Sequence, residues 1–219
     1  MRNLTLKILV AVAALIWAGS GASQGPIKEF VRQVPIDSLP YAEASEYDAS
    51  VVPTLLKMLK DPREQDYWSN IVATLGIIGD ERAVEPMIAF IERLDEGTLN
   101  RSQRRAKTSA MMALGYLVNK SGNRRALDYL ITNLTLPVRT EGFLAEQFGA
   151  TAERELNKYA VMGLAVSGNR KAAETLESIR NSPELSDDRA AQEMISEALA
   201  TNKKIADKGL AEYYRTSQP

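Results

Sequence analysis

The side chains that most often carry enzyme chemistry are scarce in this chain. Its 219 residues include no histidine and no cysteine, which excludes imidazole bases, thiol nucleophiles, disulfides and most zinc or transition-metal sites. The adjacent carboxylates Asp187 and Asp188 could hold a cation, but they follow Ser186 and precede an apolar helical pattern. We interpret them as first-turn capping residues, because acids are favourable at the positive end of a helix dipole. Common catalytic motifs are absent as well, so we predict a protein that is not an enzyme and has no cofactor.

The strongest charge pattern is a basic residue followed three positions later by an acidic one. It recurs in the octapeptides GDERAVEP, GNRRALDY and GNRKAAET, and in a weaker copy, TNKKIADK. The bases are Arg82, Arg125, Lys171 and Lys204, and the acids are Glu85, Asp128, Glu174 and Asp207. Residues three apart share one helix face, so stacked copies would bring the acid of one unit near the base of the next. The pattern predicts an inter-repeat charge ladder, and the alternative is a ligand-binding surface.

The elements that must position these charges are helices in a repeat of about 40 residues. Gly79, Gly122 and Gly168 stand 43 and 46 residues apart, and each suits the end of a helix where the chain takes positive φ. The Asp or Asn that follows suits the N-cap of the next helix, and apolar stripes at helical spacing come after it. We predict a half-repeat helix over about 50–60, then helix pairs over 66–79/81–94, 101–119/124–136, 150–167/170–181 and 187–201/203–214.

Glycines also occur in the middle of the first helix of the three clearest pairs. Gly76, Gly115 and Gly163 lie where glycine lowers helix propensity. We expect close approach between neighbouring helices to compensate for this loss.

The segment IVATLGIIGD and its later copies follow the pattern ALG-x-x-G-[DN]-x-x-A. Through this pattern the chain resembles the HEAT-repeat superfamily over roughly residues 50–205. The short PBS-lyase HEAT-like repeats are the most similar type. This resemblance implies an all-α fold, a right-handed α-solenoid of about four helix pairs plus the N-terminal half-repeat. It also implies a protein-binding scaffold, here a bacterial exported member. We expect the second helices to line the concave surface and to bind a partner around Glu85, Asp128, Tyr129 and Glu174, with Tyr129 the most exposed aromatic residue there. The alternative is an accessory or lyase-type protein that holds a small molecule in the same groove.

The N-terminus is typical of an exported protein. Arg2 and Lys7 precede a 12-residue apolar run over 8–19, and small residues follow it, which is the pattern of a signal peptide. We predict cleavage of residues 1–22, a periplasmic or secreted location and no integral membrane span afterwards; the alternative is an uncleaved membrane anchor formed by residues 8–19. The net charge of −1 favours no nucleic-acid partner, so we expect a protein partner in the cell envelope.

The remaining segments divide into an arm, a patch and an insertion. Residues 23–48 predict an extended, proline-containing arm, residues 49–214 the helical repeats and residues 215–219 a disordered tail. Arg101, Arg104 and Arg105 share one helical face within a stretch that also includes Lys107 and has no acid, either as a docking patch or as a solvated helix start. The insertion over 136–155 carries Phe143 and Phe148, which either pack or bind a partner.

Overall fold

The computed structural model describes residues 25–33, 39–93, 99–134, 157–186 and 188–217. All regular structure in these ranges is helical, which confirms the predicted all-α class. The α-helices are α1 (Ile27–Arg32), α2 (Tyr41–Ser45), α3 (Val52–Leu59), α4 (Trp68–Ile78), α5 (Val84–Glu92), α6 (Arg101–Ser121), α7 (Arg124–Thr132), α9 (Arg170–Arg180), α10 (Arg189–Lys208) and α11 (Leu210–Ser217), with a further helical stretch over 157–166. The predicted signal peptide and the insertion with Phe143 and Phe148 lie outside the described residues.

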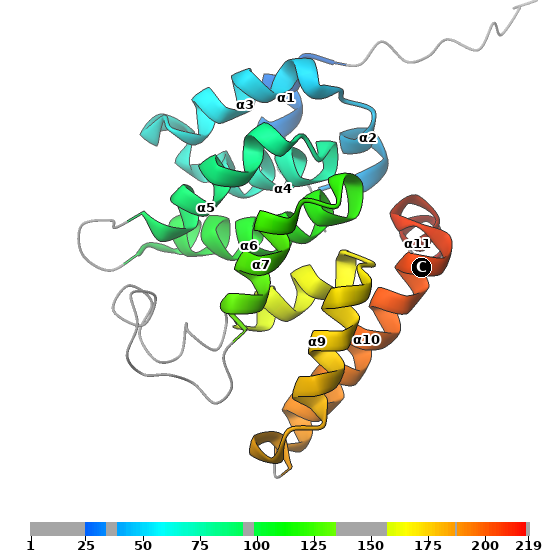
Figure 1. Ribbon diagram of the computed structural model, residues 1–219. Coiled ribbons are helices and arrows are strands. Elements are labelled where there is room, and N and C mark those ends of the chain that lie inside the picture. The colour runs from blue at the N-terminus through cyan, green and yellow to red at the C-terminus, as the bar shows by residue number, and fades with distance from the viewer. Residues whose placement is uncertain (1–24, 34–38, 94–98, 135–156, 187, 218–219) are drawn as a thin grey trace, which may run out of the picture.

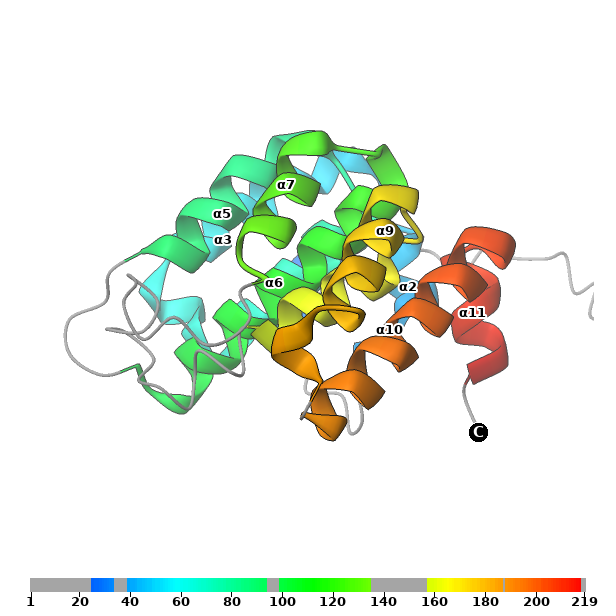
Figure 2. The same ribbon diagram turned by 60° about the horizontal axis from the view of Figure 1, so that its bottom comes forward.

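The helices form two layers that follow the order of the chain (Figure 1). The first helices of the predicted pairs, α4, α6 and the stretch 157–166, form one layer, in which α4 packs against α6 along most of its length. The second helices, α5, α7 and α9, contact one another in that order and form the other layer. Figure 2 shows α5, α7 and α9 following one another on the same side of the molecule. Each turn motif therefore joins one layer to the other.

The turns between the layers have the geometry that the octapeptides predict. Gly79, Gly122 and Gly168 end the first helices with φ of 74°, 68° and 55°, the left-handed region that favours glycine. The next residue caps the following helix in each case. Asp80 accepts a hydrogen bond from the Arg82 backbone N–H at 2.9 Å, and Asn123 and Asn169 accept equivalent bonds at 3.0 and 2.9 Å.

Close contacts between first helices explain the glycines in their middles. A Cβ atom on Gly76 would lie 2.4 Å from the Ala113 carbonyl oxygen, and one on Gly115 would lie 2.1 Å from the Gly163 carbonyl oxygen. Backbone atoms therefore meet directly across α4, α6 and the stretch 157–166. The expectation of close approach at these glycines is confirmed.

Residues 23–48 are not extended throughout, and the prediction was wrong over the two short helices that they contain. Phe30 and Val31 of α1 are buried against the core, and the buried side-chain amide of Asn70 on α4 donates to the Val31 and Gln33 carbonyl oxygens at 3.0 and 2.9 Å. Arg32 forms an ion pair with Glu64. These contacts outweigh the disruptive prolines, because they bury apolar surface and satisfy backbone groups together.

The predicted fourth helix pair is also wrong, because α10 continues through residues 201–203 as one helix of 20 residues. Asn202 is not an N-cap. Its side chain is 2% exposed and donates to the Leu164 carbonyl oxygen at 2.8 Å. The chain turns instead at Gly209, where φ is 82°. Thr201 stands where the other copies have glycine, and a threonine does not readily take positive φ, so the helix has no stop signal at this point.

The last helix extends into the predicted tail. α11 reaches Ser217, so residues 215–217 are helical rather than disordered, and Arg215 forms an ion pair with Glu212 at 2.7 Å. α11 contacts α2 near the other end of the described chain, and the two helices lie beside each other in Figure 1. The C-terminal helix therefore packs against the N-terminal arm.

Candidate functional site

The predicted charge ladder connects α5, α7 and α9. Arg125 Nε lies 3.0 Å from Glu85 Oε1, and Lys171 Nζ lies 2.7 Å from Asp128 Oδ1. The acid of one repeat thus pairs with the base of the next, which confirms the ladder at two positions. The Lys171 ammonium group lowers the pKa of Asp128 by hydrogen bonding to its carboxylate. All four side chains are more than half exposed, so water and salt screen these pairs and they contribute little stability.

The ladder has no further rung within the described residues. Arg82 at its start pairs with Asp80 of its own turn at 2.8 Å, and Glu174 at its end pairs with Arg170 of its own helix at 2.8 Å. Lys204 cannot pair with Glu174 as predicted, because α10 does not turn at residue 201. The three predicted acidic partner-binding residues are therefore all engaged in ion pairs within the chain.

Tyr129 is not an exposed aromatic residue, and that expectation was wrong. Only 6% of it is exposed, because its ring lies among the core residues of α7. Its hydroxyl group has no hydrogen-bond partner in the described part of the chain. Burial raises the pKa of Tyr129, and the negative charge of Glu92 raises it further. The ring therefore contributes to packing rather than to a surface.

The basic residues of α6 divide between the surface and the interior. Arg101, Arg104 and Arg105 are exposed, as the patch requires. Lys107 is fully buried, and its ammonium group donates to the Arg93 carbonyl oxygen. Burying a lysine ammonium group costs free energy unless the group is hydrogen-bonded. Lys107 therefore links α6 to the end of α5 at Arg93. It does not belong to the exposed patch.

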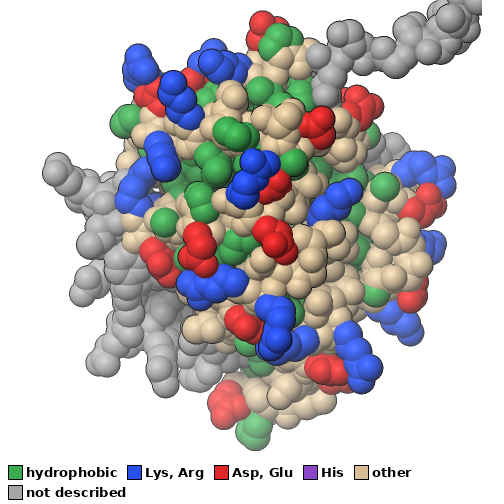
Figure 3. Space-filling view, turned by 45° about the horizontal axis from the view of Figure 1, so that its top comes forward, with side chains coloured by type: hydrophobic (Ala, Val, Ile, Leu, Met, Phe, Trp, Pro, Cys, Tyr) green, Lys and Arg blue, Asp and Glu red, His purple; other side chains and the backbone are tan. Residues whose placement is uncertain are grey.

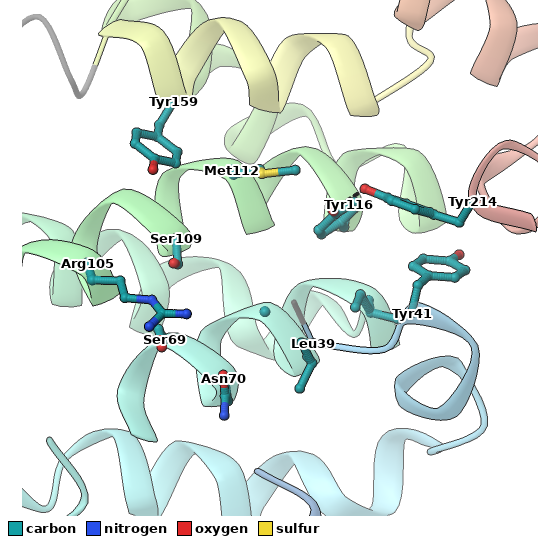
Figure 4. Close-up of a pocket in the computed structure, with 12 residues that line it drawn as sticks. Leu39, Tyr41, Ser69, Asn70, Arg105, Ser109, Met112, Tyr116, Tyr159 and Tyr214 are labelled. Atoms are coloured by element: carbon teal, nitrogen blue, oxygen red, sulfur yellow. Dashed lines mark hydrogen bonds between the residues drawn. The ribbon is translucent and has the colours of Figure 1, made fainter. Parts of the chain in front are cut away.

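A hollow in the described chain lies on the layer of first helices, away from the ladder. Two adjoining cavities of about 330 and 340 Å³ share Met112 and Tyr214 in their linings. We call the first cavity the tyrosine groove, because its lining includes Tyr41, Tyr116, Tyr159 and Tyr214 (Figure 4). The second cavity continues beside the stretch 157–166 to α10. A concave, mostly apolar lining with a few polar groups is typical of binding sites.

Three tyrosines from distant parts of the chain close one end of the groove. The rings of Tyr41 and Tyr214 stack with centroids 4.8 Å apart, and Tyr116 lies 6.3 and 6.2 Å from them. The Tyr116 and Tyr214 hydroxyl groups form a hydrogen bond. Burial raises the pKa of all three phenols, so they remain neutral donors and acceptors over the physiological pH range.

The other end of the groove is polar. Arg105 extends from α6 toward Ser69 of α4, and Ser109 lies on the next turn of α6 (Figure 4). Arg105 is the one charged residue in this lining. It has no ion pair within the described residues, and the two serine side chains have no hydrogen-bond partner there either. An arginine and two hydroxyl groups can donate hydrogen bonds to one anionic group.

Of the residues that line the tyrosine groove, only Arg105 was predicted from the sequence as a binding residue. One signal was present in α6, where Arg105, Ser109, Met112 and Tyr116 recur at helical spacing and form a stripe that is less apolar than the core stripe. The adjacent Tyr213 and Tyr214 at the end of the predicted repeats were a second signal, because tyrosine is enriched where proteins bind one another.

No protein-family model and no curated protein sequence matches this chain. Within the described ranges, no helix is long and apolar enough to cross a membrane. The same ranges contain no group of three or more side chains arranged to hold a metal ion. Asp188, which the sequence analysis considered as a cation ligand, accepts a hydrogen bond from the Ala191 N–H at 3.0 Å as the N-cap of α10.

Proposed function

We propose that this chain is an exported α-solenoid of the HEAT-like type and works as a non-catalytic scaffold that binds a protein partner in the cell envelope. The repeated turns, the two-rung ladder and the glycine contacts support the repeat architecture. The pattern of residues 1–22 supports export. Rigid stacked helices present side chains in fixed positions, which favours recognition over chemistry.

The tyrosine groove is the observation that carries the binding function. Tyrosine supplies a large contact area with few rotatable bonds and is enriched where proteins bind one another. The ladder face is less suited to binding, because its exposed acids are already paired. Figure 3 shows basic and acidic side chains interspersed on that side, with no large patch of one sign. We therefore assign the partner surface to the first helices rather than to the second helices that the sequence favoured.

Site-specific photo-crosslinking in the producing cells tests this assignment. A photoreactive phenylalanine analogue replaces Ser109 in the groove in one strain and Asp128 on the ladder in another. We expect one protein to be captured from position 109 and not from position 128, and to be lost when Tyr41 is also replaced by alanine. Capture from position 128 alone would move the site back to the ladder face, and no specific capture from either would contradict the scaffold function.

The alternative is that the groove holds a small molecule. Its volume of about 330 Å³ lies within the range of about 300–1,000 Å³ that ligand pockets occupy. Native mass spectrometry of protein purified from the producing cells distinguishes the two: a bound mass that disappears in the Tyr41→Ala variant, together with no crosslinked protein, would favour the small molecule.

A further inference from the structure

The groove combines two kinds of lining whose chemistry restricts what can bind. One end consists of Tyr41, Tyr116 and Tyr214, and the other consists of Arg105 with Ser69 and Ser109. Met112 lies between these ends, and the partly buried Tyr159 lies on the Ser109 side of Met112 (Figure 4). A ligand that fills the groove must therefore present an apolar or aromatic group and a hydrogen-bond acceptor at the two ends.

Arg105 sets the charge of that acceptor. It is the one ionisable group in the lining that is charged at neutral pH, and a guanidinium group cannot lose its proton in a protein. Arg101 lies one turn earlier on the same face of α6 and is also exposed. Asp66 contacts this part of α6 by accepting a hydrogen bond from Ser102 at 3.2 Å, and within the described residues it forms no ion pair with either arginine.

We propose that the groove binds an extended segment of the partner protein that carries an aspartate or glutamate two to four positions from an aromatic or long apolar side chain. The carboxylate pairs with Arg105 and accepts hydrogen bonds from Ser69 and Ser109. The apolar side chain packs on the tyrosines. This inference rests on the proposed function and specifies the partner's chemistry.

The geometry favours a carboxylate because the arginine can bind it through two parallel hydrogen bonds. An extended peptide fits better than a helix, because a helix with its side chains is about 10–12 Å across and the cavity holds only about 330 Å³. The tyrosine end then fixes the direction of the segment.

Selection from a random peptide library tests the inference without knowledge of the partner. Phage-displayed heptapeptides are selected on protein purified from cells that express the full chain, on the Arg105→Gln variant and on the matched control Arg124→Gln, an exposed arginine on α7. We expect the unchanged protein and Arg124→Gln to enrich peptides with an acid two to four positions from an aromatic or leucine residue, and Arg105→Gln to lose that preference. In synthetic copies with amidated C-termini, replacing the acid by its amide should weaken binding about fivefold or more.

A second readout locates the binding. The ¹³C-methyl resonance of Met112 should shift when a selected peptide is added, and that of the buried Met87 on α5 should not. Enriched peptides that shift Met112 but show no acid preference would overturn the inference and leave the scaffold function in place. Equal losses in Arg105→Gln and Arg124→Gln would show a diffuse charge effect and overturn it too. No enrichment over an unrelated helical protein would overturn both the inference and the proposed function.

Discussion

Replacing Gly115 with alanine tests the close packing on which the repeat architecture depends. The added methyl group would lie 2.1 Å from the Gly163 carbonyl oxygen and 2.6 Å from its carbonyl carbon, well inside ordinary van der Waals contact. Because these atoms belong to the backbone, they cannot rotate away as the end of a side chain can. Gly115→Ala must therefore force α6 and the stretch 157–166 apart by more than an ångström.

Two opposing terms set the size of the effect. Replacing an interior helical glycine with alanine stabilises a helix by about 1 kcal/mol. Overpacking costs roughly 1–3 kcal/mol, and backbone contact places this case at the upper end. We expect a net loss of about 1–2 kcal/mol, which for a chain of this size lowers Tm by roughly 2–8 °C. Thermal unfolding followed by circular dichroism measures this change in Tm.

A contrasting variant separates the clash from other causes of instability. Gly122→Ala places a methyl group where no heavy atom lies within 4 Å. Any loss of folding stability in this variant therefore comes only from the positive φ of 68°. Both variants should have a lower Tm than the parent protein. Gly115→Ala alone should also shift the Met112 methyl resonance, because separated helices widen the cavity. If Gly115→Ala melts at or above the parent temperature, the helices are not in backbone contact and the reasoning fails.

Three further predictions concern polar groups. Asn202→Ala removes the buried amide that donates to the Leu164 carbonyl oxygen, and urea denaturation should show a loss of about 1–3 kcal/mol; an unchanged midpoint would contradict the buried contact. Tyr129→Phe removes a buried hydroxyl group without a partner, so the same assay should give an equal or higher midpoint, and a clear decrease would reveal a partner. Asp128→Asn breaks the pair with Lys171, which lowers the pKa of Asp128. The stabilisation is present above the ordinary carboxyl pKa and is lost as pH falls, so the Tm difference between the parent and the variant at low salt should disappear on acidification; a difference that persists in acid would refute the ion pair as its cause.

The turns and the ladder could be predicted because their causes are local. A glycine followed by Asp or Asn specifies a helix end and the next helix start within two residues. The base and acid then lie at fixed positions on the second helix, so Arg125 and Glu85 meet once the repeats stack in register. The mid-helix glycines predicted close contact for a similar reason, since their low helix propensity requires compensation.

The end of the repeat array could also have been predicted from the sequence. Three apolar residues in or just after α7 have polar or smaller counterparts on α9, 46 residues later: Leu127, Ile131 and Leu134 correspond to Ala173, Glu177 and Arg180. Terminal repeats need a polar outer face, so no further second helix was required beside α9. This change, together with Thr201 in the place of glycine, indicates that α10 packs against α9 without a second helix following it in the array.

The tyrosine groove could not be predicted from the repeats alone, because one end of it is closed by Tyr41 of the N-terminal arm and Tyr214 of α11. Moving the final glycine from position 201 to Gly209 extends α10 by two turns, which carries α11 away from α9 and onto α2. Tyr214 then reaches Tyr116, 98 residues earlier, and Tyr41 in the N-terminal arm. No local pattern encodes a contact over such separations. The same replacement of glycine by threonine that ended the array therefore also created the surface to which we assign partner binding.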